Sequence, residues 1–399
     1  MKRLFRKLHL WLSVPLGLLI TAICFSGAAL VFENEIMRLI RHDVYYVERV
    51  TEAPLAADSI VRRVAQTLPQ GVTVTGVTFF NDPQRTCQVN LSKPHRAALY
   101  VDRYTGEIKG DNQRTAFFAF MFRLHRWLLD RSGQNSTVWV GKLIVGITTA
   151  LFVVIVITGV VLWWPRNRKA LLRGLKISVT KGWRRFWYDF HVVGGVYATL
   201  LLLVMALTGL TWSFGWYRTG VYKLFGLETT QTEKKAEPQV ASASDGQQVK
   251  NRPQGNNPNG KREGRGKRED TPRVLHWQTV YEELVERNPH YKQITISDGT
   301  ASVAFNQAGN QRASDRYAFD TRTGAVGEVT LYADAERSGK IRGWIYSLHV
   351  GSWGGMVTRI LSFLAALLGA TLPLTGYYLW MRKWWSKRNN RGPVRPPVK

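Results

Sequence analysis

Four long runs of apolar residues divide the chain, and polar sequence separates each run from the next. The uncharged stretches are residues 10–32, 143–165, 360–381 and, apart from His191, 190–217. A helix rises about 1.5 Å per residue, so each run can cross a hydrocarbon core of roughly 30 Å. Buried helices of soluble proteins are shorter. We therefore predict transmembrane helices over residues 9–33, 138–165, 188–216 and 357–381.

The two polar segments between these spans, residues 34–137 and 217–356, repeat one order of elements. Residues 55–71 have the apolar spacing of an amphipathic helix with Asp58 or Ser59 as its cap, and residues 276–291 form the second such helix. Alternating or β-branched runs after each helix are typical of strands. They cover residues 72–79, 86–91 and 97–101 in the first segment and 293–297, 301–306 and 317–319 in the second.

Both strand runs end in the same turn pattern. The first is Asp102 followed by Thr105-Gly106, and the second is Asp320 followed by Thr323-Gly324. An Asp that accepts backbone N–H bonds two residues on, with Gly at a position of positive φ, is hairpin turn chemistry. We expect two small α+β domains of one kind. Residues 228–273 are polar, Gly- and Pro-rich, and are interpreted as a flexible insert.

The membrane spans repeat as well. Aligning the halves places His9 on His191 and Ser26-Gly27 on Thr208-Gly209. Upstream of the second and fourth spans the matching residues are His125 and His349, and at their far ends Thr158-Gly159 matches Thr375-Gly376. The fold class predicted is an α-helical membrane protein built as a tandem duplication of span, α+β domain, His-bearing segment and span.

The charge distribution gives the chain an orientation. The 55 Lys+Arg residues exceed the 28 Asp+Glu residues and give a net charge of +27, which suggests nucleic acid as a partner. However, nineteen of these cations lie in acid-free clusters at residues 1–8, 165–187 and 381–399, beside the apolar runs. This arrangement is typical of the segments that flank membrane spans, and it is not the pattern of a nucleic-acid-binding surface. The positive-inside rule predicts that residues 1–8, 166–187 and 382–399 are cytoplasmic and that both large segments are external, which means periplasmic in a Gram-negative host.

Two features of the N-terminal half leave alternatives open. The first span could be a cleaved signal peptide, although its apolar run is longer than a signal sequence needs. The two cysteines, Cys24 and Cys87, are too far apart in topology to pair. No CxxC or CxxCH motif occurs, which argues against zinc ribbons and covalently attached c-type haem.

The histidines provide the candidate chemistry. Ionisable residues in or near a membrane bundle are functional candidates, although a lone interfacial His can simply hydrogen-bond to a neighbouring helix. Two imidazoles from related helices can ligate haem b from opposite sides, whereas zinc requires more ligands. We predict one haem held by His9 and His191 near the inner face and another held by His125 and His349 near the outer face. Nearby glycines could admit a porphyrin or pack helices: Gly17, Gly194, Gly195, Gly351, Gly354 and Gly355.

These motifs, in this order, resemble those of the PepSY-associated transmembrane (PepSY-TM) family. The resemblance rests on the four spans, the two Asp-x-x-Thr-Gly turns, Leu348-His349-Val350-Gly351 and the sequence from Thr375 to Trp380. It covers nearly the whole chain except residues 228–273. It implies an iron-regulated inner-membrane protein similar to di-haem ferric-siderophore reductases, whose histidine ligands carry over onto His9, His125, His191 and His349.

The resemblance also implies a reaction, which is one-electron reduction of Fe³⁺ in a siderophore at the periplasmic face. No catalytic side chain is needed, and a separate donor, quinol or a cytoplasmic flavoprotein, must supply the electrons. Two alternatives stay open: a non-enzymatic membrane module that regulates a peptidase, and a component of a siderophore or iron permease. Candidate wall residues for the siderophore, which could equally be membrane-surface anchors, are Arg123, Arg126, Trp127, Arg342, Trp344 and Tyr346.

Overall fold

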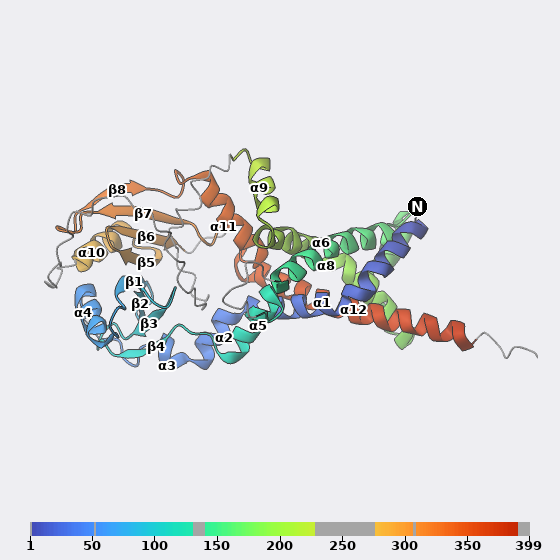
Figure 1. Ribbon diagram of the computed structural model, residues 1–399, viewed down its shortest axis with the longest axis horizontal. Helices are drawn as coiled ribbons and strands as arrows, with labels where there is room; N and C mark the ends of the chain where they lie inside the picture. The colour runs from blue at the N-terminus through green and yellow to red at the C-terminus, as the bar shows by residue number, and fades with distance from the viewer. Residues whose placement is uncertain (1, 52, 131–139, 228–275, 306–308, 390–399) are drawn as a thin grey trace, which may run out of the picture.

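The molecule is elongated, with a helical bundle at one end and a β-sheet layer at the other (Figure 1). The computed structural model describes residues 2–51, 53–130, 140–227, 276–305 and 309–389. The predicted insert at residues 228–273 lies outside the described residues.

Four helices in the described part of the chain are long and apolar enough to cross a membrane, which confirms the four predicted spans. They are α1 (Lys2–Val31), α6 (Val140–Trp163), α8 (Trp183–Ser213) and α12 (Gly355–Asn389). α1 and α8 begin earlier than the apolar runs and include basic residues. Adding a turn to an existing helix is inexpensive, and the stems of Lys and Arg side chains let their charges reach water.

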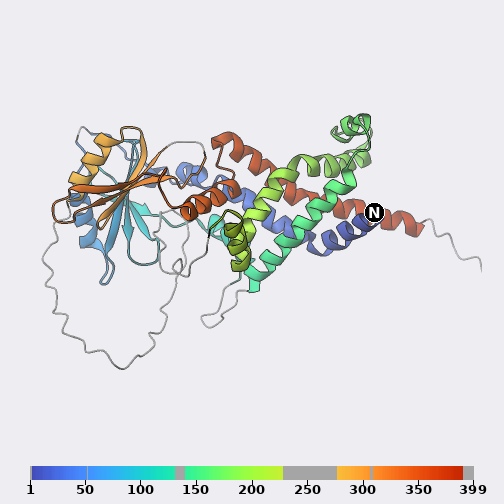
Figure 2. The ribbon, with the colours of Figure 1, turned by 90° about the horizontal axis from the view of Figure 1, so that it is seen from above.

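The four long helices form a ring in which α1 and α8 each pack against both α6 and α12. Figure 2 shows them crossing at one end of the molecule. Ala198, Leu202 and Ala365 form a small buried cluster between α8 and α12. The outer surface carries large exposed apolar side chains such as Leu18 and Leu200, which are 67% and 70% exposed. A lipid bilayer would cover such a surface.

The sheet layer is one continuous antiparallel sheet of eight strands. Its order is β4-β3-β2-β1-β5-β6-β7-β8, so the two predicted α+β units are joined through β1 and β5. Thr78 and Thr295 pair across this junction, and their hydroxyls lie 2.9 Å apart. The strands are β1 (Val74–Phe80), β2 (Cys87–Leu91), β3 (Ala98–Val101), β4 (Ile108–Asp111), β5 (Tyr291–Ser297), β6 (Thr300–Phe305), β7 (Ser314–Phe319) and β8 (Val326–Thr330).

Two helices, α4 (Ala57–Thr67) and α10 (Trp277–Arg287), complete this layer and share one hydrophobic core with the strands. Ile60 and Val64 from α4 are fully buried, as are Val280 and Leu284 from α10. Both helices and six of the eight strands follow the predicted pattern. The edge strands β4 and β8 are missing from the prediction because they are short and mostly unburied, so they lack a clear alternation.

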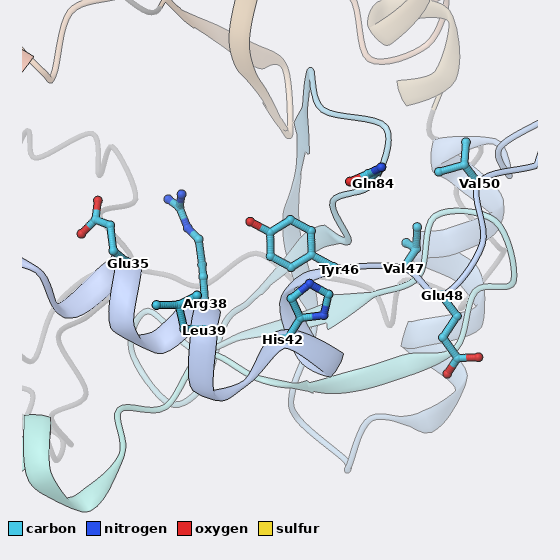
Figure 3. A pocket seen from close by; sticks show the side chains of 9 residues that line it. All are labelled: Glu35, Arg38, Leu39, His42, Tyr46, Val47, Glu48, Val50 and Gln84. Carbon is cyan, nitrogen blue, oxygen red and sulfur yellow. The ribbon is translucent and has the colours of Figure 1, made fainter. Parts of the chain in front are cut away.

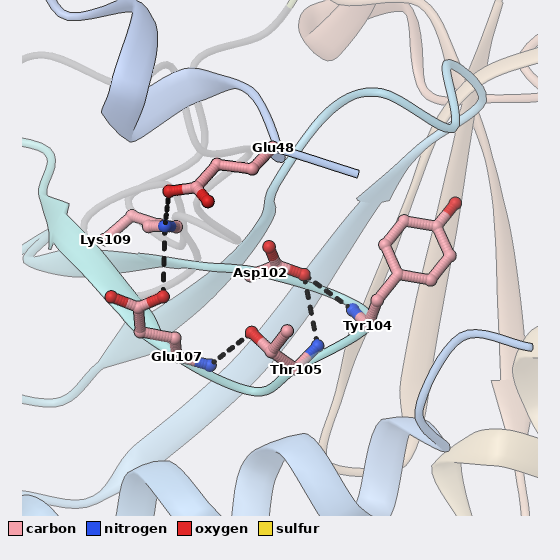
Figure 4. Close-up of polar contacts among 6 residues, drawn as sticks. All are labelled: Glu48, Asp102, Tyr104, Thr105, Glu107 and Lys109. Carbon is pink, nitrogen blue, oxygen red and sulfur yellow. Dashed lines mark hydrogen bonds and ion pairs between the residues drawn. The ribbon is translucent and has the colours of Figure 1, made fainter. Parts of the chain in front are cut away.

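The predicted turn chemistry is present in both halves. Asp102 accepts hydrogen bonds from the backbone N–H groups of Tyr104 at 2.8 Å and Thr105 at 3.2 Å (Figure 4). Asp320 accepts one from Arg322 at 2.7 Å. Gly106 and Gly324 both have a φ of +76°, which is the conformation that glycine permits.

The prediction that Asp58 caps the start of its own helix is wrong, because Asp58 caps a different helix. Asp58 lies within α4, and its carboxylate accepts from the N–H groups of Trp277 at 3.0 Å and Gln278 at 3.3 Å, at the start of α10. In the opposite direction, the side-chain oxygen of Gln278 accepts a hydrogen bond from the backbone N–H of Ala57, at the start of α4, at 2.7 Å. Each helix therefore caps the other, across more than two hundred residues of sequence.

Short helices connect the sheet to the bundle and are absent from the predicted pattern. They are α2 (Glu33–Ile40), α3 (His42–Tyr45), α5 (Ala116–Trp127), α7 (Arg168–Gly174), α9 (Gly215–Leu224) and α11 (Arg337–His349). Two ion pairs hold α2 in place: Glu33 with Arg114 at 2.6 Å, and Glu35 with Arg359 of α12. α5 and α11 end at the bundle, so each carries a predicted site histidine to it.

Candidate functional site

The four histidines singled out by the repeat all reach from one helix to a neighbouring helix of the bundle. His9 of α1 contacts α6, and His191 of α8 contacts α12. His125 of α5 contacts α1, and His349 of α11 contacts α8. All four imidazoles are half-buried. Each half of the chain therefore contributes one histidine at each end of the bundle.

A hydrogen bond to a backbone carbonyl sets the protonation of each ring. A carbonyl can only accept, so Nδ1 carries the proton in the neutral imidazole and the lone pair lies on Nε2. The acceptors are Ile155 for His9 at 3.1 Å, Leu372 for His191 at 3.1 Å, Ile23 for His125 at 2.9 Å and Met205 for His349 at 2.9 Å. Metal-ligating histidines are commonly oriented by such a bond from the second ring nitrogen.

Threonine hydroxyls reinforce three of these bonds. Thr158, Thr375 and Thr208 donate to carbonyls of their own helices, so their oxygens accept from Nδ1 of the adjacent imidazole. The Oγ1–Nδ1 distances are 3.0 Å to His9, 2.9 Å to His191 and 3.2 Å to His349. Ser26 takes the matching place near His125, and its hydroxyl donates to Ala22 and Ile23.

A glycine follows each of these hydroxyl residues and faces Cε1 of the histidine ring. A Cβ atom added at Gly27 would lie 2.8 Å from Cε1 of His125, which is closer than real Cβ atoms approach. The corresponding distances are 3.2 Å from Gly209 to His349, 3.3 Å from Gly376 to His191 and 3.5 Å from Gly159 to His9. The missing side chain lets each ring lie against the helix backbone.

These glycines are not those that the sequence analysis selected. Gly17 faces the ring of Tyr377, Gly194 and Gly195 face leucines of α12, and Gly351 faces Ser362. The signal that could have identified the right ones is the repeated Ser/Thr-Gly pair itself. Such a pair occurs once in each of the four long helices, and each time it lies opposite a site histidine.

The two imidazoles at the sheet end of the bundle, those of His125 and His349, are called the outer pair; their ring centroids lie 6.1 Å apart with the planes at 51°. Two metal–imidazole nitrogen bonds of about 2.0 Å, with the radius of each ring added, require roughly 6 Å between centroids. Burial, followed by the nearby His125, lowers the pKa of His349 to about 4, and burial also lowers the pKa of His125. Both imidazoles are therefore neutral at neutral pH, as metal ligation requires.

The inner pair is His9 of α1 and His191 of α8, at the other end of the bundle. Gly27, which touches His125, lies 18 residues after His9 on the same helix, and Gly209 lies 18 residues after His191. At 1.5 Å per residue the inner and outer pairs are about 27 Å apart along the helices. No three His, Cys, Asp or Glu side chains gather as a metal-binding group anywhere in the described residues.

The three wall candidates on α5 lie beside the outer pair. Trp127 is 6% exposed, and the guanidinium of Arg126 lies over its ring and that of Phe122, at 4.9 Å and 5.4 Å from the centroids. Arg123 donates to the carbonyl of Leu129 at 3.5 Å. These side chains are engaged within the protein.

The three candidates on α11 are similarly placed. Arg342 is half-buried, Trp344 is 41% exposed and packs against Gly309, and Tyr346 lies under the guanidinium of Arg312 at 4.1 Å. None of the six wall candidates lines the hollow of about 860 Å³ beside α2 and α3.

Comparison with known proteins yields one match over most of the chain. Residues 6–383 match the family model described as the PepSY-associated TM region. A search of curated proteins finds no match. The matched range includes all four site histidines, both halves of the sheet and nearly the full length of the four long helices.

Proposed function

The chain belongs to the PepSY-associated TM family, and from this premise we propose that it is a haem-dependent reductase of ferric siderophores. The observation that supports the proposal best is the set of four imidazoles. They form two pairs at opposite ends of one bundle, and each presents an unprotonated Nε2. Bis-His ligation of haem b uses two such nitrogens for each iron.

His9 and His191 would hold the inner haem, and His125 and His349 the outer one. When bound, haem supplies a one-electron carrier whose potential depends on its ligands and their hydrogen bonds. The chain's own residues orient these ligands. The carbonyl and hydroxyl acceptors fix each Nδ1–H, and the four Ser/Thr-Gly pairs leave room for the rings.

The proposed topology places the inner pair near the cytoplasm. The basic clusters flank the ends of α1, α8 and α12 that lie near His9 and His191, and the positive-inside rule assigns that side to the cytoplasm of a bacterial inner membrane. The sheet layer and the outer pair then face the periplasm. In the same proposal, the repeated order of elements reflects an internal duplication.

The reaction would be Fe³⁺ to Fe²⁺ within a chelate, with one electron taken up per iron. Oxidation of one quinol to quinone releases two electrons and two protons, enough for two chelates, and a cytoplasmic flavoprotein is the other donor class. The hard oxygen ligands of a siderophore favour the more highly charged ion, so reduction weakens binding and releases iron.

The test is optical spectroscopy of the purified full-length chain, oxidised, reduced with dithionite and then mixed with a ferric chelate. We expect the spectrum of low-spin haem b, two haems per chain, and reoxidation that matches the formation of Fe²⁺. A colourless protein would refute the reductase and favour a peptidase-regulating module. Haem that is not reoxidised by any ferric chelate would refute the substrate assignment.

A further inference from the structure

A hollow in the described part of the molecule lies between α2, α3 and the loops beside the sheet, and none of the four site histidines lines it. It has a volume of about 860 Å³. One face of α2 and α3 provides Glu35, Arg38, Leu39, His42 and Tyr46, and Val47, Glu48, Val50 and Gln84 complete the lining (Figure 3). In Figure 3 the side chains of Glu35 and Arg38 rise from α2 on the same side as the hydroxyl of Tyr46.

Both carboxylates of this hollow have cationic partners. Glu35 pairs with Arg359 of α12, and Glu48 pairs at 3.0 Å with Lys109, which also pairs with Glu107 at 3.0 Å. In contrast, the guanidinium of Arg38 has no hydrogen-bond or ion-pair partner among the described residues, and neither has the ammonium of Lys292, which lies outside the lining. Arg38 is therefore a cation of the lining whose charge is not used in an ion pair.

A third cation lies behind Tyr46. Arg85 is 8% exposed and stacks on Phe80 at 4.3 Å and beside Tyr46 at 5.5 Å. Burial, followed by repulsion from Arg38, lowers the pKa of Arg85. Desolvation lowers the pKa of Lys292, with Arg38 adding to the effect and Glu35 opposing it. Arg38 thus lies close to two other cations, and an anion between them would relieve their repulsion.

We propose that this hollow is the docking site of the ferric chelate, and that the chelate is anionic and rich in oxygen. The site would use Arg38 as its charged donor, with Tyr46 and Gln84 as neutral ones. This inference rests on the proposed reductase function, because a chelate docked here must accept its electron from the outer histidine pair.

The position of the hollow suits that role. Glu35, on its rim, lies eight residues after Gly27, which touches His125, and only Phe32 separates α1 from α2. The rim is therefore at most roughly 12 Å from the outer pair along the helices. The lining also combines cations with Leu39, Val47 and Val50. Such a mixture fits a bulky chelate with an organic periphery and charged oxygens.

The experiment measures binding of gallium(III) tris(catecholate), a redox-inert trianion of the same shape as the ferric chelate, to the full-length protein in neutral detergent. Arg38→Gln should weaken binding about tenfold or more, since it removes a charge-assisted contact. Lys292→Gln removes a cation near Arg38 but outside the lining, and should weaken binding less. Arg322→Gln removes an exposed cation from the distant β7–β8 turn and should leave affinity unchanged. Thermal unfolding of each variant checks that it is folded.

Two further measurements distinguish failure of the docking site from failure of the proposed reductase function. Equal gallium affinity in Arg38→Gln, Lys292→Gln and the parent would overturn the docking site, while reoxidation of haem by the ferric chelate would leave the reductase standing. Weakened gallium binding in a protein that purifies without haem would support the site and refute the reductase. If the variants instead lose only binding of phosphatidylglycerol added in mixed micelles, the hollow is a lipid headgroup site and the chelate assignment is wrong.

Discussion

The imidazole rings of His125 and His349 lie 6.1 Å apart, although their residues come from different halves of the chain and from the ends of two different helices. If this pair holds the outer haem, His125→Ala or His349→Ala should remove one haem of two, because one axial ligand is lost. His9→Ala and His191→Ala should remove the other. The haem-to-protein ratio, measured as the pyridine haemochrome, checks each variant.

The matched control is His42→Ala, since His42 stacks on Tyr46 and lies outside the bundle contacts. It should keep both haems. Retention of two haems in all four site variants would contradict the ligand assignment, and loss of both haems in His42→Ala would show that the assay reports general misfolding.

Substitution of the glycines opposite the outer pair should affect the outer haem as strongly as substitution of the histidines. A Cβ atom at Gly27 would lie 2.8 Å from Cε1 of His125, so Gly27→Ala must displace the ring or the helix. We expect loss of the outer haem, or a shift of its spectrum to high spin, and a milder effect for Gly209→Ala at 3.2 Å. Gly220→Ala in α9 is the control, because nothing lies within 4 Å of the added atom. An unchanged spectrum in Gly27→Ala would mean that His125 is not held against this backbone.

The hydroxyls near the inner pair should tune its reduction potential. The hydroxyl oxygens of Thr158 and Thr375 accept hydrogen bonds from Nδ1 of His9 and His191. These bonds make each Nε2 a stronger electron-pair donor to iron, which would stabilise the ferric state. Thr158→Val should keep haem binding, because the carbonyl of Ile155 remains as an acceptor. One hydrogen bond of about 1 kcal/mol corresponds to a rise on the order of 40 mV in the inner potential. Spectroscopic redox titration measures it, with Thr149→Val as the control, and a fall in potential would contradict the argument.

The spans are predictable from sequence because membrane crossing depends on local properties. Apolar length identifies α1, α6, α8 and α12, and the pattern of strands is visible wherever one face is buried, as in β5. The histidine pairs could be predicted because the repeat marks them. Their hydrogen-bond acceptors could not, since the contact of His125 with Ile23 depends on how α5 returns to α1.

The junction of the two halves of the sheet cannot be predicted from local sequence patterns. Pairing of β1 with β5 joins segments more than two hundred residues apart and is decided by burial of both halves in one core. The capping rule fails at Asp58 for the same reason. Asp58 lies in α4, but the helix that its carboxylate caps is α10, which is its neighbour in space and not in sequence. Arg38 enters the lining of the hollow only when α3, which follows α2, packs beside β3 and β4, so no motif marks it.

Asp58 provides a test of the joined core. Asp58→Ala removes both side-chain acceptors at the start of α10 and should destabilise the sheet layer by about 1 kcal/mol, within the usual range for a lost N-cap. Ser59→Ala, one residue on, is the control, since its hydroxyl makes no such contact with α10. Thermal unfolding followed by circular dichroism in the β region measures the difference. Equal effects of the two substitutions would argue against the cap.

The ion pair of Glu33 and Arg114 should give a stability effect that depends on pH. Both side chains are about one-tenth exposed, and Arg114 also lies over Phe122 at 3.8 Å. Burial raises the pKa of Glu33 and outweighs the opposing effect of Arg114. In Arg114→Met the opposing effect is lost, so the pKa rises further. A raised carboxyl pKa contributes stability that is full below the unfolded pKa of about 4.3 and is lost as pH rises through the folded value.

Arg114→Met should therefore be destabilised by about 3 kcal/mol at pH 8, where Glu33 is ionised and buried without its partner, and by less at pH 5, where it takes up a proton. Thermal midpoints in detergent at the two pH values measure this difference. Arg287→Met breaks an exposed pair with Glu283 within α10 and should shift the midpoint little at either pH. An equal loss in Arg114→Met at both pH values would mean that the cation–π contact with Phe122, and not the charge of Glu33, is what Arg114 provides.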